Sequence, residues 1–192
     1  TAEIALLLLL GAARRAYEGQ EMLRAGRWTG WGPTQLMGRQ LSGKRLELLK
    51  EAFPKLARVA VIWNSADFGM TLKFREIELA AKALRVAVQP SAVREPKDFD
   101  LVFSEIMRKR PDALFVITDP LTQLNRKQLV QLATKNRLPA MYENAPYVDD
   151  GGLMAYGPSQ AENMERALHH VDKILKGTKP SELPIEQPTK FE

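Results

Sequence analysis

The sequence contains no cysteine and only two histidines. Without cysteine, the chain can form no disulfide, no zinc–cysteine site and no thiol nucleophile. The two histidines, His169 and His170, are adjacent on a predicted helix, so their side chains point about 100° apart and cannot easily share a metal ion. The G-x-S-x-G nucleophile elbow and the Walker loop are absent as well. We therefore expect no catalytic residues, no bound metal and no cofactor.

The sequence also lacks a concentrated basic segment. Lysine and arginine total 28 and aspartate and glutamate 23, which gives a formal net charge of +5. The basic residues are scattered along amphipathic segments, whereas a nucleic-acid-binding surface needs a dense basic stripe with aromatic residues between. The composition therefore indicates an ordinary solvated surface and no nucleic-acid partner.

An apolar run near the start of the chain, Ile4–Leu10, is far shorter than the roughly 20 residues that span a bilayer. Glu3 precedes this run and Arg14 and Arg15 follow it, which is the opposite charge order from that of a secretory signal. We expect a buried helix over residues 2–25, which ends before a loop rich in glycine, tryptophan and proline over residues 27–40.

Apolar strands alternate with helical segments after this loop. The predicted strands are Arg58–Trp63, Val86–Val88, Ala113–Ile117, Pro139–Tyr142 and Leu153–Tyr156. The predicted helices begin with residues 42–52, capped by Ser42, and continue with segments around 70–84, 99–107, 121–133 and 164–175. Strands without polar interruption, separated by helices, indicate a parallel sheet that is covered on both faces.

The predicted fold is therefore α/β, a doubly wound and mostly parallel sheet of about five strands with helices on both faces. We assign this lobe to residues 41–177. The N-terminal helix and loop occupy residues 1–40, and an extended tail that contains prolines occupies residues 178–192.

Candidate ligand-binding residues follow from this fold, because an open parallel sheet binds ligands at the carboxyl ends of its strands. Hydroxyl, carboxylate, amide and aromatic groups at this rim suit a small polar or aromatic solute. For each residue taken alone, a role as a helix cap or turn former is an equally good interpretation. The predicted rim consists of Asn64, Ser65, Asp67, Phe68, Thr118, Asp119, Tyr142, Glu143 and Tyr156.

Residues from Leu41 onward resemble the ABC-transporter substrate-binding proteins of the tryptophan/tyrosine-type family. The resemblance implies a lobe of the type I periplasmic binding proteins, in which two α/β lobes close on a solute and deliver it to a membrane permease. It covers one such lobe, so we expect weakened affinity. The stretches that carry the resemblance are 41–51, 58–64, 119–121, 138–142, 151–158, 171–177 and 183–192.

Residues 1–40 resemble a different family, the D-2-hydroxyacid dehydrogenases of the glyoxylate reductase type. The matching stretches are 1–5, 13–15, 24–33 and 36–39. In those enzymes this segment leads into the cofactor domain, but the glycine fingerprint and the catalytic segments do not follow in this chain. The resemblance therefore implies a segment without its chemistry.

The sequence thus predicts a non-enzymatic solute-binding lobe, with an amino acid as a possible solute and an ABC permease as the partner that the family role implies. Two alternatives stay open. The first is a fragment of an NAD-linked D-2-hydroxyacid dehydrogenase. The second is an oligomerisation or interaction module built on residues 1–40, around Trp28 and Trp31. The resemblance implies an exported protein, while no export signal is recognisable, so the compartment stays open.

Overall fold

A computed structural model describes residues 41–179, 182–183 and 190–192. The predicted helix over residues 2–25, the loop over residues 27–40 and most of the predicted tail lie outside the described residues. The remainder contains a sheet of five strands, all parallel, in the order β2-β1-β3-β4-β5. The strands are β1 (Arg58–Asn64), β2 (Ala87–Val93), β3 (Ala113–Val116), β4 (Ala140–Tyr142) and β5 (Met154–Ala155).

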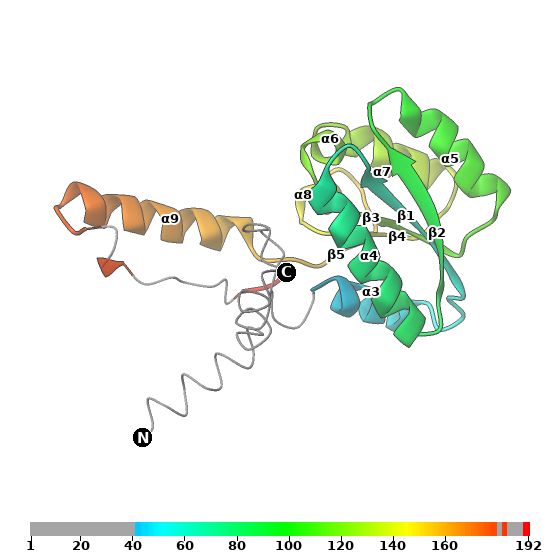
Figure 1. The fold of residues 1–192 in the computed structure, drawn as a ribbon, viewed down its shortest axis with the longest axis horizontal. Coiled ribbons are helices and arrows are strands. Elements are labelled where there is room, and N and C mark those ends of the chain that lie inside the picture. Colours follow the sequence, from blue (N-terminus) through cyan, green and yellow to red (C-terminus); the bar gives the residue numbers. More distant parts are fainter. Residues whose placement is uncertain (1–40, 180–181, 184–189) are drawn as a thin grey trace, which may run out of the picture.

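Helices cover both faces of this sheet, which confirms the predicted doubly wound fold (Figure 1). One face packs on α3 (Leu41–Ala52) and α4 (Phe68–Ala83). The other face packs on α5 (Asp98–Arg108) and α7 (Arg126–Lys135). Two short helices, α6 (Pro120–Leu124) and α8 (Pro146–Asp149), follow β3 and β4 at the carboxyl edge of the sheet.

The strand sequences explain the two cores, because successive side chains of a strand point to opposite faces. In β1, Val59 and Val61 contribute to the core under α3 and α4, while Ala60 and Ile62 contribute to the core under α5 and α7. The strand is apolar at every one of these positions and is therefore buried on both sides. This double burial gives the continuous apolar runs seen in the sequence.

The structure differs from the sequence prediction at several element boundaries. Ser42 lies inside α3, which begins at Leu41, and is therefore not its N-cap. The single helix predicted around 121–133 is divided into α6 and α7 at Asn125, whose backbone leaves the helical region and whose side chain donates to the carbonyl of Leu121 at 2.8 Å. The short helix α8 was not predicted, and β2 extends further, to Val93.

The last helix, α9 (Gln160–Leu175), projects away from the sheet and its covering helices (Figure 1). It ends at Leu175, two residues before the predicted stop at Gly177, which adopts a positive φ of 99° and donates to the carbonyl of Ile174. At the base of α9, the backbones of Gly157 and Glu192 exchange two hydrogen bonds of 2.9 Å. Among the described residues, no helix is long and apolar enough to cross a membrane.

Candidate functional site

The carboxyl ends of the parallel strands meet at one edge of the sheet, and polar side chains gather there. The strand order reverses between β1 and β3, which is the position where open α/β sheets bind ligands. Here the space between the two strand ends is bridged by the protein itself. Asn64 at the end of β1 donates from Nδ2 to Oδ2 of Asp119 at 2.7 Å.

Asp119 has a structural role in addition to this bond. Its carboxylate accepts from the backbone N–H of Thr122 at 2.9 Å, and the Thr122 hydroxyl accepts from the N–H of Asp119 at 2.9 Å. This reciprocal arrangement is a capping box, which fixes the first turn of α6. The cap interpretation that the sequence left open for single residues of the rim therefore applies to Asp119.

A cavity of about 360 Å³ lies beside this point, on the face of the sheet that α3 and α4 cover. Its walls come from the first turns of α3, the first half of α4, the loops after β3 and β4, and the start of α9. The lining residues are Leu41, Ser42, Arg45, Lys73, Glu76, Thr118, Glu143, Asn144, Pro158, Gln160 and Asn163.

Glu143 is the centre of the polar contacts in this cavity, although its side chain is only 6% exposed. Its Oε1 accepts from Arg45 at 2.8 Å. Its Oε2 accepts from Lys73 at 2.8 Å and from the backbone N–H of Thr118 at 3.0 Å. A buried carboxylate is tolerated only when it is paired and hydrogen-bonded, and Glu143 satisfies this requirement with three donors from three elements.

Arg45 is buried as deeply as its partner and donates to two acceptors. Its Nε donates to the carbonyl oxygen of Tyr156 at 2.6 Å, while Nη1 donates to Glu143. Burial lowers the pKa of Arg45, and the charge of Glu143 opposes that shift. The pair therefore ties α3 both to the end of β4 and to the chain that leaves β5.

Two polar atoms of cavity-lining residues find no hydrogen-bond partner among the described residues. They are the hydroxyl oxygen of Thr118 and the side-chain oxygen of Asn144, and both atoms are buried from solvent. Lys73 adds further capacity, because an ammonium group has three donor hydrogens and its side chain is 21% exposed. A ligand in the cavity could thus meet the cationic donor of Lys73.

The structure brings only some of the predicted rim residues to this cavity. Thr118 and Glu143 line it, and Asn64 and Asp119 form the bridge beside it. Tyr142 lies on the opposite face of the sheet, where its fully buried ring stacks on Tyr147 at a centroid distance of 4.5 Å. Side-chain alternation along β4 explains this placement, because Tyr142 and Glu143 are consecutive.

The remaining predicted rim residues occupy other positions. Asp67 caps α4 by accepting from the backbone N–H groups of Gly69 and Met70. Phe68, at the start of α4, is 74% exposed. Ser65 contacts the carbonyl of Val93 at 3.4 Å. Tyr156, on the chain after β5, stacks on Phe191 with a distance of 5.9 Å between the ring centroids.

Sequence reasoning missed the helical half of the site. Ser42 and Arg45 lie one turn apart near the start of α3, and Lys73 and Glu76 lie one turn apart on α4. A helix beside a parallel strand runs in the opposite direction and begins at the carboxyl edge of the sheet, so these polar turns near the helix starts carried a usable signal. Among the described residues, no group of three or more histidine, aspartate or glutamate side chains could hold a metal ion.

Comparisons with known proteins identify relatives of two kinds. A family model described as ABC transporter substrate binding protein matches residues 34–192. A tyrosine-binding protein of Clostridioides difficile (strain R20291) is 22% identical over 142 residues, which cover 74% of this chain and 41% of that protein. A glycerate dehydrogenase of Hyphomicrobium methylovorum is 59% identical over only 46 residues, which cover 24% of this chain and 14% of the enzyme.

The fold has solved relatives. The structure of an ABC domain in complex with L-Trp from Streptococcus pneumonia has a TM-score of 0.68 and 18% identity, over 79% of this chain and 52% of that one. This likeness confirms the predicted fold of the periplasmic-binding-protein type. The chain spans about half, or less, of the length of each of these proteins.

Proposed function

Because the chain belongs to the ABC transporter substrate-binding protein family, we propose that its α/β lobe binds an amino acid in the cavity beside Glu143. The observation that carries this proposal is the charge of the lining. Arg45 and Lys73 bring cationic groups to one cavity of about 360 Å³, and Glu76 and Glu143 bring anionic groups. An amino acid carries a carboxylate and an ammonium group close together, and a small polar site that orients it needs both kinds of partner.

Lys73 is the residue best suited to meet the carboxylate. Its ammonium group uses one donor hydrogen on Glu143 and its side chain is partly exposed, so further donor capacity faces the cavity. Glu76, which lines the same cavity, is the anionic partner that we propose for the ammonium group. Arg45 holds Glu143 in place and acts as a positioning residue.

An aromatic amino acid is the first solute to test. The tyrosine-binding relative and the solved domain with bound L-Trp support this choice. Leu41 and Pro158 add apolar surface to the lining, against which an aromatic side chain can pack.

The expected affinity is modest, since the cavity is open and one lobe contacts one side of the solute. Tryptophan has about 15 non-hydrogen atoms, and at about 0.3 kcal/mol for each atom the binding free energy is about 4.5 kcal/mol. This free energy corresponds to a dissociation constant of about 0.5 mM. Delivery of the solute to an ABC permease is the role that we propose for the whole protein, and we propose that the chain catalyses no reaction.

The test is a nuclear magnetic resonance titration of the isotope-labelled chain with L-tryptophan, L-tyrosine, glycine and NADH. We expect the amide signals of Thr118 and Asn144 to move with an aromatic amino acid and to reach half of their full change at about 0.5 mM. The short dehydrogenase match makes NADH the informative competitor. Shifts with NADH alone would overturn the proposal in favour of a nucleotide-binding fragment.

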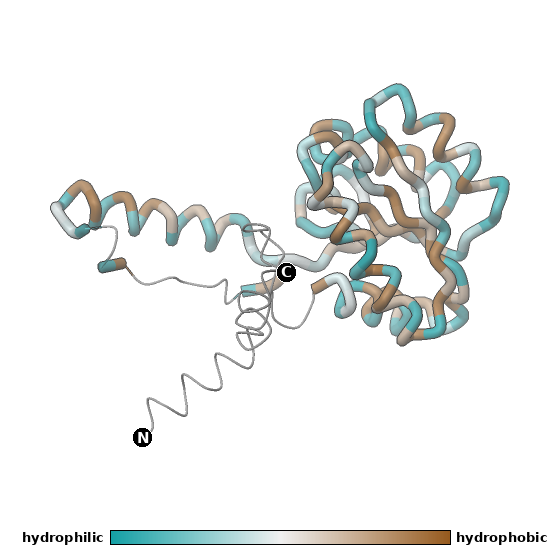
Figure 2. The backbone as a smooth tube through the Cα atoms, viewed as in Figure 1, coloured by the Kyte–Doolittle hydropathy of each residue, from teal (hydrophilic) through white to brown (hydrophobic). Residues whose placement is uncertain are grey.

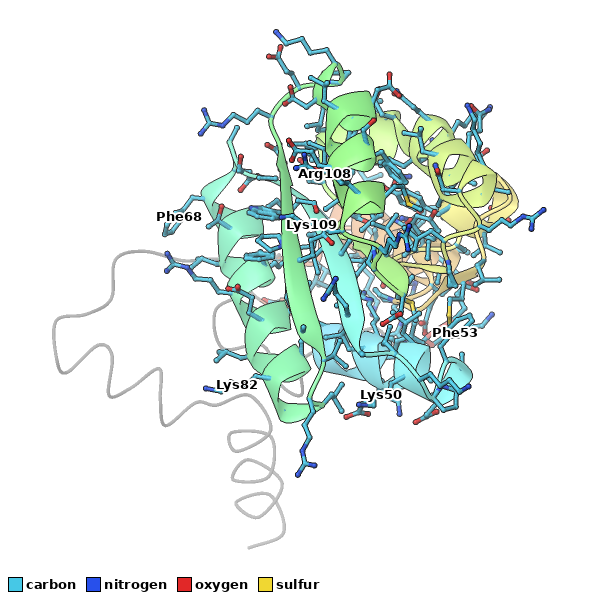
Figure 3. The ribbon with its side chains drawn as sticks, turned by 90° about the vertical axis from the view of Figure 1, so that its right-hand side faces the viewer. Lys50, Phe53, Phe68, Lys82, Arg108 and Lys109 are labelled. Carbon is cyan, nitrogen blue, oxygen red and sulfur yellow. The ribbon has the colours of Figure 1, made fainter. Side chains whose placement is uncertain are left out.

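A matched pair of lysine variants locates the site. Lys73→Met removes the donor in the cavity, whereas Lys82→Met changes an exposed lysine at the far end of the same helix, which Figure 3 shows at the opposite end of α4 from Phe68. We expect Lys73→Met to weaken tryptophan binding by at least about fivefold, the effect of one charged hydrogen bond. Equal affinities of the two variants would exclude this cavity as the site.

A further inference from the structure

Three arginines have a backbone conformation that is unusual for their residue type. Among the described residues, the non-glycine residues with a positive φ are Arg85 (56°), Arg110 (49°) and Arg137 (51°). Each of them directly follows the residue that caps the C-terminus of a helix, which is α4, α5 or α7. Glycine is the usual residue at this position, because a side chain there is strained. The same unfavourable residue at three equivalent positions points to a use for the arginine side chains.

The helix dipole alone does not account for these three arginines. A cation near the C-terminus of a helix is stabilised by the dipole. Each of the three helices already has such a cation in its last turn, namely Lys82, Arg108 and Lys135. The three left-handed arginines are exposed, and within the described part of the chain they form no salt bridge. Their charges are therefore available to a partner.

The topology of the sheet places these arginines in one row. A helix between parallel strands returns the chain to the amino edge of the sheet, where the next strand begins. Arg58 begins β1, and Arg85 lies two residues before β2. Arg110 and Arg137 lie three residues before β3 and β4, respectively. Because β2, β1, β3 and β4 are neighbours in that order, the four arginines form a row about 15 Å long, which we call the basic row.

Further polar and cationic groups surround the basic row. Figure 3 shows Lys50 and Lys82 at one end of the lobe, and Phe68 toward the other end. Figure 2 shows a hydrophilic stretch at the turn between α5 and β3, on the side of the lobe away from α9. In that turn, Asp112 accepts from two backbone N–H groups at the start of β1, at 2.8 and 2.9 Å. The amino edge is thus a cationic face, and it lies opposite the cavity beside Glu143.

An apolar pocket adjoins one end of the basic row. This cavity of about 400 Å³ is lined by Arg137 together with the apolar side chains of Phe53, Leu138 and Leu153. Leu153 directly precedes β5, so it lies at the same edge of the sheet, and it is 58% exposed. The amino edge therefore offers cations and an exposed apolar side chain together. This combination is typical of surfaces that bind a membrane interface.

We propose that the amino edge of the sheet binds an anionic phospholipid surface. A guanidinium group pairs with a phosphate through two parallel hydrogen bonds. Nucleic acids carry phosphates as well, but their bases stack on aromatic side chains. No residue next to the four arginines in the sequence is aromatic. The cavity beside Glu143 faces away from the bound surface and stays accessible, and the inference does not depend on solute binding.

The test is sedimentation of the full chain with vesicles that contain equal parts of phosphatidylglycerol and phosphatidylcholine. Each basic residue near an anionic surface strengthens binding by about fivefold, so the four arginines predict half-maximal binding at about 1 mM lipid. Vesicles of phosphatidylcholine alone should not sediment the chain. Binding to the anionic vesicles should weaken as the salt concentration rises, because salt screens exposed charges.

The left-handed arginines allow a variant that keeps the fold. This triple variant carries Arg85→Gly, Arg110→Gly and Arg137→Gly. Glycine is favourable at all three positions, so the urea midpoint should be unchanged or higher. Lipid binding should nevertheless fall by about 100-fold, because three of the four charges of the basic row are lost.

The matched control removes three exposed cations near the carboxyl edge of the sheet. It carries Arg94→Gln, Lys97→Gln and Lys127→Gln. The net charge falls by the same amount, but the basic row is intact, so the control should bind vesicles within about threefold of the parent chain. Equal lipid binding by the glycine variant and this control would overturn the inference.

A further variant separates a membrane from other polyanions. Leu153→Gln keeps all charges and should weaken vesicle binding by about fivefold, because it removes an exposed apolar contact with the lipid. Unchanged vesicle binding by this variant would overturn the membrane as the partner. Binding of the parent chain to single-stranded DNA without binding to the anionic vesicles would overturn it as well, and would identify nucleic acid as the partner.

Discussion

Replacing Glu143 by glutamine tests whether the buried charge cluster holds the lobe together. The substitution keeps the volume and removes the charge, which leaves Arg45, 5% exposed in its side chain, without its anionic partner. The carboxylate of Glu143 accepts from three donors, which belong to Arg45, Lys73 and the backbone N–H of Thr118. In the glutamine variant, an amide N–H₂ group replaces one carboxylate oxygen and faces at least one of these donors. Removing one partner of a buried ion pair costs about 3–5 kcal/mol.

The assay is urea unfolding followed by far-ultraviolet circular dichroism. At a slope of about 1.5 kcal/mol per molar urea, the expected loss lowers the unfolding midpoint by about 2–3 M. Glu47→Gln is the matched control, since Glu47 pairs with Lys44 at 3.3 Å while both side chains are about half exposed. An exposed pair of this kind contributes less than about 1 kcal/mol.

The double variant Arg45→Met with Glu143→Met separates pairing from packing. The single variants Arg45→Met and Glu143→Met complete this double-mutant cycle. If the ion pair is the origin of the loss, the double variant should be more stable than the sum of the two single losses predicts, by about 2 kcal/mol. A loss for Glu143→Gln that does not exceed the loss for Glu47→Gln would refute the reasoning. In that case the charge cluster would contribute no more to the free energy of unfolding than an exposed ion pair does.

Three further predictions follow from single residues. Burial raises the pKa of Tyr147 to about 12 in the folded chain, whereas a tyrosine in the unfolded chain has a pKa near 10. The unfolded chain therefore loses this proton first as the pH rises. The contribution to stability that is present below pH 10 falls by about 1.4 kcal/mol at pH 11. The Tyr147→Phe variant should lack this part of the alkaline loss when urea midpoints are compared between pH 9 and 11. Gly157→Ala should cost about 3 kcal/mol or prevent folding, because a Cβ there would lie 2.0 Å from the carbonyl oxygen of Glu143. Gly43→Ala is the control inside α3, where a Cβ meets only ordinary contacts. This variant should raise the free energy of unfolding by about 1 kcal/mol. Asp67→Ala should cost about 1 kcal/mol in the same unfolding assay, because it removes the cap of α4; a loss below about 0.3 kcal/mol would argue against that cap.

The strands could be predicted because the sheet is buried on both faces. Residues 59–63 and 113–117 are apolar at consecutive positions, a pattern that depends little on the rest of the molecule. The division at Asn125 was harder to predict, since the residues around it have helical spacing throughout. There the side chain of Asn125 bonds to the carbonyl of Leu121 and ends α6 before α7 begins.

The candidate site was predictable only in part, for a related reason. Glu143 directly follows β4 and Thr118 lies two residues after the end of β3, and topology alone brings strand ends together. Arg45 and Lys73 come from helices, and which turn of a helix reaches the sheet edge depends on how that helix packs. Tyr142 shows a limit of a different kind, because residues that end one strand alternate between two faces and cannot all serve one cavity.

The position of Leu41 and Pro158 has a consequence for how such a lobe is inherited. Both residues line one cavity, so Leu41, where α3 begins, lies near Pro158, where the chain passes from β5 to α9. A unit whose two ends are neighbours can be inserted into another protein, or removed from it, without stretching the host chain or opening the unit's own core. Recombination could therefore join this unit to an unrelated preceding segment. Its sheet, its two cores and its charge cluster would stay intact.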